Sequence, residues 1–271
     1  MERVDMENKG PNRYTRILES IFVKHYKEGA SEIEFERAEI NQAAEELGIA
    51  LPKNLGDILY SFRYRTALPK SITSKTPKCF EWIIRPAGKG KYKLVAVKQS
   101  SITPSNILAE TKIPDATPGV IVKYSMSDEQ ALLAKLRYNR LIYIFTGLTC
   151  YSLQSHLRTT LKDGSQVETD EIYVGLDKRG VHYVLPVQAK GGRDKLGIVQ
   201  IEQDFELCRL KFPQLTCRSI AAQFMNDNLI ALFEFEQTLE GIKVSSEKHY
   251  RLVKSDELSP DELRSYSLRP I

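Results

Sequence analysis

Three consecutive strand patterns between residues 149 and 190 constrain the fold of this chain more than any other feature of its sequence. Each pattern is rich in β-branched and aromatic residues. Short turns separate them, one at Asp163-Gly164 and one between Lys178 and Gly180. Because tight turns return the chain alongside itself, the segment predicts three successive antiparallel strands.

Helix and strand patterns flank these strands in a definite order. Before them, GVIVKYSM (119–126) predicts a short strand, and residues 129–147 predict a helix that begins at Ser127 or Asp128. After them we expect an amphipathic helix, a strand, a hairpin and an acidic peripheral helix or tail, at 191–213, 217–225, 229–253 and 254–268. The order helix, three strands, helix, strand indicates a domain of the α+β class.

The N-terminal part shows helical spacing followed by a basic hairpin. Residues 12–26 predict one helix, and a second helix follows Phe35 and runs to about Leu47. Residues 49–65 predict a helix that ends in arginines, and 79–99 predict two strands with lysines at their turn. Two helices joined by a Gly-containing turn, with a basic hairpin behind them, are typical of a winged helix-turn-helix. A helical bundle with an attached hairpin and no DNA contact is the alternative.

Charge is concentrated in the same region. The whole chain has a formal net charge of +4, but residues 51–100 hold eleven Lys or Arg residues against two acids, a local charge of +9. Such a field is expected of a protein that binds phosphate backbones, although a solvated basic surface would look the same. The DNA-binding candidates are basic residues of the third helix, the residues near it and the hairpin, namely Lys53, Arg63, Arg65, Lys89, Lys91 and Lys93.

A length of 271 residues suits two domains. The predicted division is a disordered tail at 1–12, a winged-helix domain at 13–100, a Pro-, Ser- and Thr-rich linker at 101–118 and a second domain at 119–271. No stretch is apolar enough to span a membrane, and the N-terminus has no secretory pattern. Four cysteines without CxxC spacing predict reduced, mostly buried thiols and no zinc site, as expected of a cytoplasmic protein.

Acidic and basic residues gather at one end of the second predicted hairpin. Glu168, Asp170 and Glu171 begin one strand, and Gln188 and Lys190 end the next. A turn centred on residue 179 places position 170 across from 188 and position 168 across from 190, so alternation predicts that these four share a face. A slip of one residue would spoil this pairing. Solvated strand ends are the alternative interpretation.

These residue types suit hydrolysis of a phosphodiester. Mg²⁺ prefers carboxylate, carbonyl and water ligands. A lysine beside the metal can hold or deprotonate the attacking water and offset charge that develops on the phosphate. One or two acids and a lysine at the open end of a hairpin provide these parts.

The sequence resembles the PD-(D/E)xK superfamily of restriction endonucleases and related nucleases. The resemblance is carried by Asp170, the hairpin and Gln188-Ala189-Lys190, and the flanking elements are similar to the superfamily's αβββαβ core. It implies that Asp170 binds the metal and that Lys190 is the catalytic lysine. Gln188 stands where the family has Glu or Asp, so it would ligate Mg²⁺ through an uncharged carbonyl, and Glu168 or Glu171 would compensate. The resemblance also suggests accessory roles for polar residues of the flanking helices, namely Gln200, Gln203 and Glu129.

The sequence therefore favours a Mg²⁺-dependent DNA endonuclease, of the type II restriction enzyme kind, that acts on double-stranded DNA. With one site per chain, cleavage of both strands implies a homodimer. A winged-helix regulator whose nuclease-like domain serves dimerisation is the second hypothesis, and Gln188 in place of an acid favours it. An RNA-processing nuclease is a third, because a basic domain binds either polymer.

Overall fold

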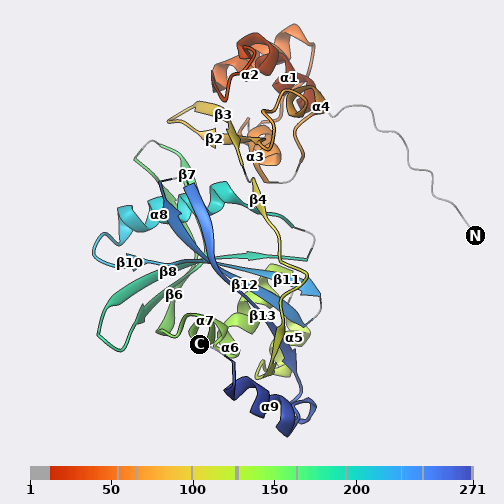
Figure 1. Ribbon diagram of the computed structural model, residues 1–271. Coiled ribbons are helices and arrows are strands. Elements are labelled where there is room, and N and C mark those ends of the chain that lie inside the picture. The colour runs from red at the N-terminus through yellow and green to blue at the C-terminus, as the bar shows by residue number, and fades with distance from the viewer. Residues whose placement is uncertain are drawn as a thin grey trace, which may run out of the picture. The chain divides into compact units, whose positions relative to one another are not determined.

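The computed structural model describes most of the chain (Figure 1). The described residues are 13–53, 55–64, 66–98, 100–125, 128–162, 164–192, 194–226, 228–239 and 241–269, without the side chains of Asp57, Tyr64 and Asp128. The predicted tail at 1–12 lies outside them. The chain divides into two compact units, the first extending to Ser100 and including Lys162–Ser165, the second formed by Ser101–Leu161 and Gln166–Ile271.

The first unit consists of four helices and a small sheet among the described residues. Its elements in chain order are α1 (Arg13–His25), β1 (Glu32–Glu36), α2 (Arg37–Glu46), α3 (Gly56–Tyr64), α4 (Lys70–Thr73), β2 (Glu81–Pro86) and β3 (Lys91–Val97). The strands form an antiparallel sheet in the order β1-β3-β2. The three predicted helices and the hairpin are confirmed as elements, whereas β1 and α4 were not predicted.

The core of the first unit joins α1 to the hairpin. Ile17 and Ile21 lie about one helical turn apart on α1, Phe22 is next to Ile21, and all three are buried on one face. The Phe22 ring packs edge-on against Trp82 of β2, with centroids 5.7 Å apart. The hairpin is thus held by apolar contacts, which leaves its polar side chains on the surface.

The second unit is built on a mixed eight-stranded sheet. Seven strands follow the order β5-β13-β12-β11-β8-β7-β6, and β10 pairs with β8. The pairs β5–β13, β8–β11 and β8–β10 are parallel and the others antiparallel. The strands are β5 (Glu110–Pro114), β6 (Thr149–Thr160), β7 (Gln166–Leu176), β8 (His182–Lys190), β10 (Thr216–Cys217), β11 (Ser219–Asn226), β12 (Leu229–Thr238) and β13 (Gly241–Val253), and β4 (Ser101–Ile102) pairs separately with β9 (Leu196–Gly197).

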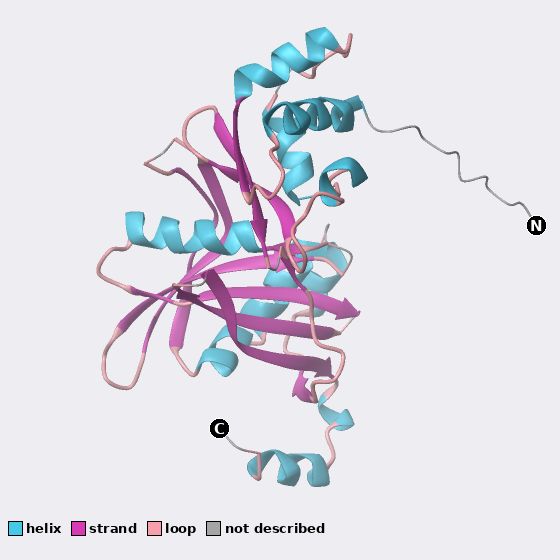
Figure 2. Cartoon of the chain, turned by 45° about the horizontal axis from the view of Figure 1, so that its top comes forward, coloured by secondary structure: helices cyan, strands magenta, loops and turns pink. Residues whose placement is uncertain are grey.

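Helices cover both faces of this sheet (Figure 2). On one face α6 (Asp128–Tyr138) and α7 (Leu141–Thr146) pack against Leu185 and Val187 of β8. On the other, α8 (Ile198–Lys211) packs Leu207 and Cys208 against Val184. Successive residues of β8 therefore enter different cores, which explains why the apolar sequence VLPV is continuous rather than alternating.

Two predicted elements of the second unit were wrong. The segment 101–118 is not a linker, because it supplies β4 and β5, and β5 pairs with β13 from Glu110 to Pro114. GVIVKYSM does not form a strand, because residues Gly119–Tyr124 form the helix α5, none of whose residues is buried. The predicted helix over 129–147 is divided in two at Arg140, whose φ of 52° ends one helix before the next begins.

The C-terminal segment forms a helix, as predicted. α9 (Pro260–Ser267) begins at a capping box in which Ser259 and Glu262 accept each other's backbone N–H groups. Glu262 also pairs with Lys112 of β5, at 2.6 Å between Oε1 and Nζ. The helix is thus anchored to the first strand of the large sheet.

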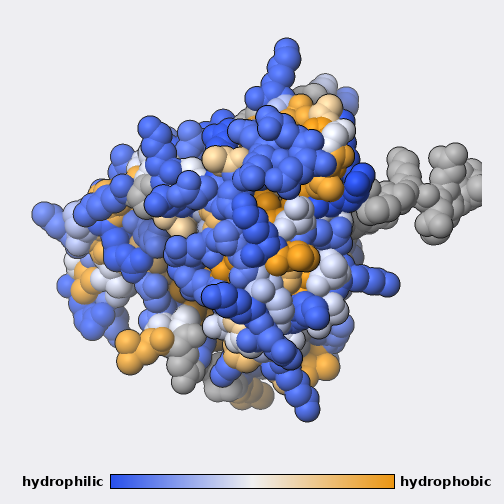
Figure 3. Space-filling view, turned by 90° about the horizontal axis from the view of Figure 1, so that it is seen from above, coloured by the Kyte–Doolittle hydropathy of each residue, from blue (hydrophilic) through white to orange (hydrophobic). Residues whose placement is uncertain are grey.

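The surface is mostly polar in the view of Figure 3, where the apolar residues form separate patches. Within the described part of the chain, no helix is long and apolar enough to cross a membrane. The four thiols are free, but they are not mostly buried as predicted. Cys208 is buried, Cys150 and Cys217 are half-buried, and Cys79 is exposed.

Candidate active site

The hairpin of β7 and β8 determines the geometry of the site. Its turn is held by Asp177, whose carboxylate accepts the backbone N–H groups of Arg179 and Val181 at 2.8 and 3.0 Å. The ladder runs from the pair Leu176–His182 to the pair Glu171–Val187. This register centres the turn on Arg179, as predicted. The ladder stops at Glu171, so it does not include the predicted pairs of position 170 with 188 and of position 168 with 190.

Asp170 and Lys190 lie where the ladder ends. Asp170 is half-buried, and its Oδ2 accepts the backbone N–H of Ala189 at 2.7 Å, which holds the carboxylate beside the end of β8. The Lys190 side chain is only 13% exposed, and its Nζ lies 3.6 Å from Oε1 of Glu129 at the start of α6. Glu129, predicted as an accessory residue, thus contacts the predicted catalytic lysine directly.

Gln188 is buried between β7 and α8. Its Nε2 donates to both carboxylate oxygens of Asp204, at 3.0 and 3.1 Å, and lies 3.3 Å from the Glu168 backbone oxygen. Gln200 Nε2 lies 3.5 Å from the Gln188 carbonyl oxygen. Two successive turns of α8 therefore meet Gln188, and the accessory residue Gln200 belongs to the site. Gln203, one position before Asp204, is also buried in this helix.

The acids of the site influence each other. Burial raises the pKa of Asp204 well above 3.8, and the charge of Asp170 raises it further, while hydrogen bonds from Gln188 and Thr169 and the charge of Lys190 lower it. Burial also raises the pKa of Glu129, with Asp170 and Asp194 adding to the effect and Lys190 opposing it. The end of the hairpin thus holds several carboxyl groups around one lysine, an arrangement that a further cation would stabilise.

Glu168 and Glu171, the two acids expected to compensate for Gln188, do not join this group. The Glu168 side chain points to β6, where its Oε2 lies 3.0 Å from Nε of Arg158. Glu171 is fully buried, and its Oε1 accepts Nε and Nη2 of Arg137 at 3.1 and 2.9 Å. The predicted shared face of Glu168, Asp170, Gln188 and Lys190 is therefore wrong for Glu168, whose contribution is its backbone oxygen.

Asp204 is the functional candidate that the sequence prediction missed. It follows Gln200 by four residues, the spacing that places two side chains on one helix face. That spacing was available in the sequence, but an acid within an amphipathic helix is usually solvated. Asp194, an exposed acid in the loop after β8, was missed as well.

The side chains at this site can hold Mg²⁺ only if the protein supplies few of its ligands. No three His, Cys, Asp or Glu side chains are grouped to hold a metal ion among the residues that the structure describes. Mg²⁺ usually keeps several waters and takes one or two carboxylates from the protein, which Asp170 and Asp204 can provide. The Gln188 carbonyl oxygen faces Gln200, so the predicted ligation by Gln188 requires its amide group to turn.

The basic residues of the first unit that were predicted to bind DNA differ in how exposed they are and in whether they pair with acids. Lys53 and Lys89 are exposed. Lys91 and Lys93 pair with acids of β1, with shortest Nζ–O distances of 3.7 and 3.1 Å. The Nε and Nη2 atoms of Arg63 are buried, which disfavours the predicted contact with DNA. Arg65 lies outside the described residues.

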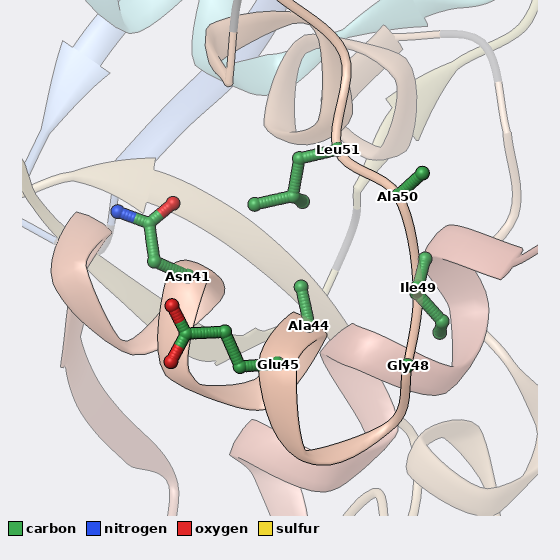
Figure 4. A pocket seen from close by; sticks show the side chains of 7 residues that line it. All are labelled: Asn41, Ala44, Glu45, Gly48, Ile49, Ala50 and Leu51. Atoms are coloured by element: carbon green, nitrogen blue, oxygen red, sulfur yellow. The ribbon is translucent and has the colours of Figure 1, made fainter.

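A hollow of about 450 Å³ lies in the first unit, at the end of α2 (Figure 4). Its lining residues are Asn41, Ala44, Glu45, Gly48, Ile49, Ala50 and Leu51. Glu45 is the single ionisable residue among them. The hollow therefore does not offer the paired groups that catalysis needs, in contrast to the end of the β7–β8 hairpin.

No protein-family model, curated protein or solved structure matches this chain. Its function is therefore inferred from the chemistry of its two units. The second unit brings together Glu129, Asp170, Lys190 and the pair Gln188–Asp204 at one end of two neighbouring strands.

Proposed function

We propose that this protein is a Mg²⁺-dependent endonuclease that cleaves double-stranded DNA, with a PD-(D/E)xK-like catalytic domain formed by the second unit. The observation that carries the proposal is the buried pair of Gln188 and Asp204 beside Asp170 and Lys190. Asp204 of α8 would supply the charge that Gln188 does not bring to the position where the superfamily motif has Glu or Asp. A restriction enzyme is the role that suits such a chain best.

Each residue has a role that follows from its position. Asp170 and Asp204 would hold Mg²⁺, which when bound would activate a water molecule and offset charge on the phosphate. Lys190 has a mostly buried stem and a single ammonium group, so it can orient the attacking water and stabilise the developing charge. Glu129 lies beside the ammonium group and limits its movement.

The first unit would locate the DNA as a winged helix. The helices of this unit, followed by an antiparallel hairpin with a basic turn, support this part of the proposal. The hairpin turn carries the exposed Lys89, and Lys53 is exposed before α3. Phosphate contacts of this kind position a protein on a duplex, while base contacts specify the sequence. Two chains, one for each DNA strand, would act as a homodimer.

The alternative is a winged-helix regulator without catalysis. Two observations favour it: the ammonium group of Lys190 is paired with Glu129, and the Gln188 carbonyl oxygen faces Gln200 rather than Asp170. Both contacts would have to change when metal and DNA bind. A cleavage assay separates the two functions.

The test uses the purified full-length protein, mixed plasmid and phage DNA, and Mg²⁺. We expect discrete fragments from the wild type, and none from Lys190→Met or in the presence of EDTA. Lys195→Met is the matched control, because Lys195 is an exposed lysine in the loop that follows β8. DNA that remains intact but is retarded in a gel would contradict the proposal and favour the regulator.

A further inference from the structure

Strand β6 is irregular where it passes the candidate active site. The pairs on either side of His156 place it opposite Asp170 in the register with β7. His156 has a φ of 49°, in the left-handed region that residues with a side chain rarely adopt. A register shift precedes it between Ser152 and Gln154. Such irregularities redirect side chains and are frequent at functional sites.

The His156 ring is held beside the residues of the site. Its Nε2 lies 2.9 Å from Nε2 of Gln130, the neighbour of Glu129 on α6. Its Nδ1 lies 3.6 Å from Oε1 of Glu168, whose backbone oxygen faces the Gln188 amide. The side chain is 49% exposed, so the ring is positioned by the protein and remains accessible to a ligand.

The guanidinium group of Arg158 lies next to the ring's partner, Glu168. Arg158 Nε lies 3.0 Å from Oε2 of Glu168, and the Arg158 side chain is 78% exposed. One carboxylate, that of Glu168, therefore orients both side chains. The charged groups near the ring are Glu168 and Asp170 of β7, Arg158 of β6 itself, and Glu129 of α6, beside the neutral Gln130.

We propose that His156 and Arg158 form a phosphate-binding rim that holds the DNA backbone at the entrance of the candidate active site. The identity of the ligand rests on the proposed function. A histidine ring can donate an N–H to a phosphate oxygen, and a guanidinium donates charge-assisted hydrogen bonds to the same oxygens.

Binding of a labelled duplex to the full-length protein tests the rim. The measurements are made in EDTA, so that cleavage cannot interfere, and at several salt concentrations. The variants are His156→Asn, because asparagine tolerates the left-handed backbone, and Arg158→Gln. Arg179→Gln is the control, because Arg179 is an exposed arginine that also pairs with an acid, at the opposite end of the β7–β8 hairpin.

We expect His156→Asn to weaken binding about fivefold. Arg158→Gln should lower the salt dependence by about one phosphate contact, and Arg179→Gln should change neither. Unchanged binding by both rim variants would overturn the rim, even if the protein cleaves DNA. If binding depends on the rim but the wild type does not cleave DNA in Mg²⁺, the proposed nuclease is overturned and the rim is not. If the wild type does not bind DNA at all, both proposals are overturned.

Discussion

Asp204 is the residue on which the interpretation of Gln188 depends. Glutamine brings no charge to a cation, and its amide nitrogen here donates to a buried carboxylate from the next helix. In the proposed nuclease, Gln188 and Asp204 together would take the place of the single acid in the superfamily motif. Burial raises the pKa of Asp204 above its usual range, and a bound cation would oppose that effect.

The raised pKa of Asp204 predicts a particular pH dependence of stability. The folded state binds this proton more tightly than the unfolded chain does. The neutral form therefore adds to the free energy of unfolding in full below pH 3.8, and this addition is lost as the pH rises through the folded-state pKa. Asp204→Asn should therefore be more stable than the wild type by about 1 kcal/mol near neutral pH. The difference should vanish as the pH falls towards 4.

Urea unfolding at several pH values, without divalent cations, measures this difference. Because other carboxyl groups titrate alike in both proteins, only the difference between the two is interpreted. A variant that is less stable than the wild type at neutral pH would contradict a raised pKa of Asp204 in the folded protein.

At the scale of elements, the contact between Arg137 and Glu171 ties α6 to β7 on the face opposite α8. Glu171 is fully buried, whereas the Arg137 side chain is 44% exposed. Because of this difference in burial, removing one partner costs more stability than removing the other. Arg137 without Glu171 can turn to water, whereas Glu171 without Arg137 remains a buried charge.

We therefore expect Arg137→Met to destabilise the protein by about 3 kcal/mol, and Glu171→Gln by only about 1 kcal/mol. The double variant should recover much of the loss of Arg137→Met, because no buried charge remains. Chemical denaturation of all four proteins measures both single changes and their coupling. Equal losses in the two single variants would contradict this account of the pair.

Elements whose signals are local were predictable from the sequence. The turn at Arg179 was predictable, and with it the register of β7 and β8 from Glu171 to Leu176. Segments whose structure depends on distant partners were not predictable. β5 is a strand because β13 pairs with it, and the β-branched residues of 119–124 suggested a strand where the chain forms α5.

The site was predictable only in part for the same reason. Asp170 and Lys190 lie in one hairpin, but Glu129 and Asp204 come from helices packed on its two faces. Sequence spacing cannot show which acid of a helix faces a strand end when several are present. Glu168 and Glu171 were nearer in sequence, and cations of β6 and α6 bind them instead.

At the scale of the whole molecule, two units with separate cores suit a division of labour between finding DNA and cutting it. The basic hairpin belongs to the first unit and the acids around Lys190 to the second. We propose that Asp170 and Asp204, rather than Glu168 or Glu171, supply the acids of the nuclease site.

The most direct measurement of this claim is the rate of a single round of DNA cleavage by the full-length protein in Mg²⁺. We predict that Asp170→Asn and Asp204→Asn each lower the rate by about 100-fold or more, since each removes a carboxylate from the metal site. Glu206→Gln, an exposed acid two positions beyond Asp204 on the same helix, should leave the rate unchanged. Full activity in Asp204→Asn would contradict the account, and so would the absence of cleavage by the wild type.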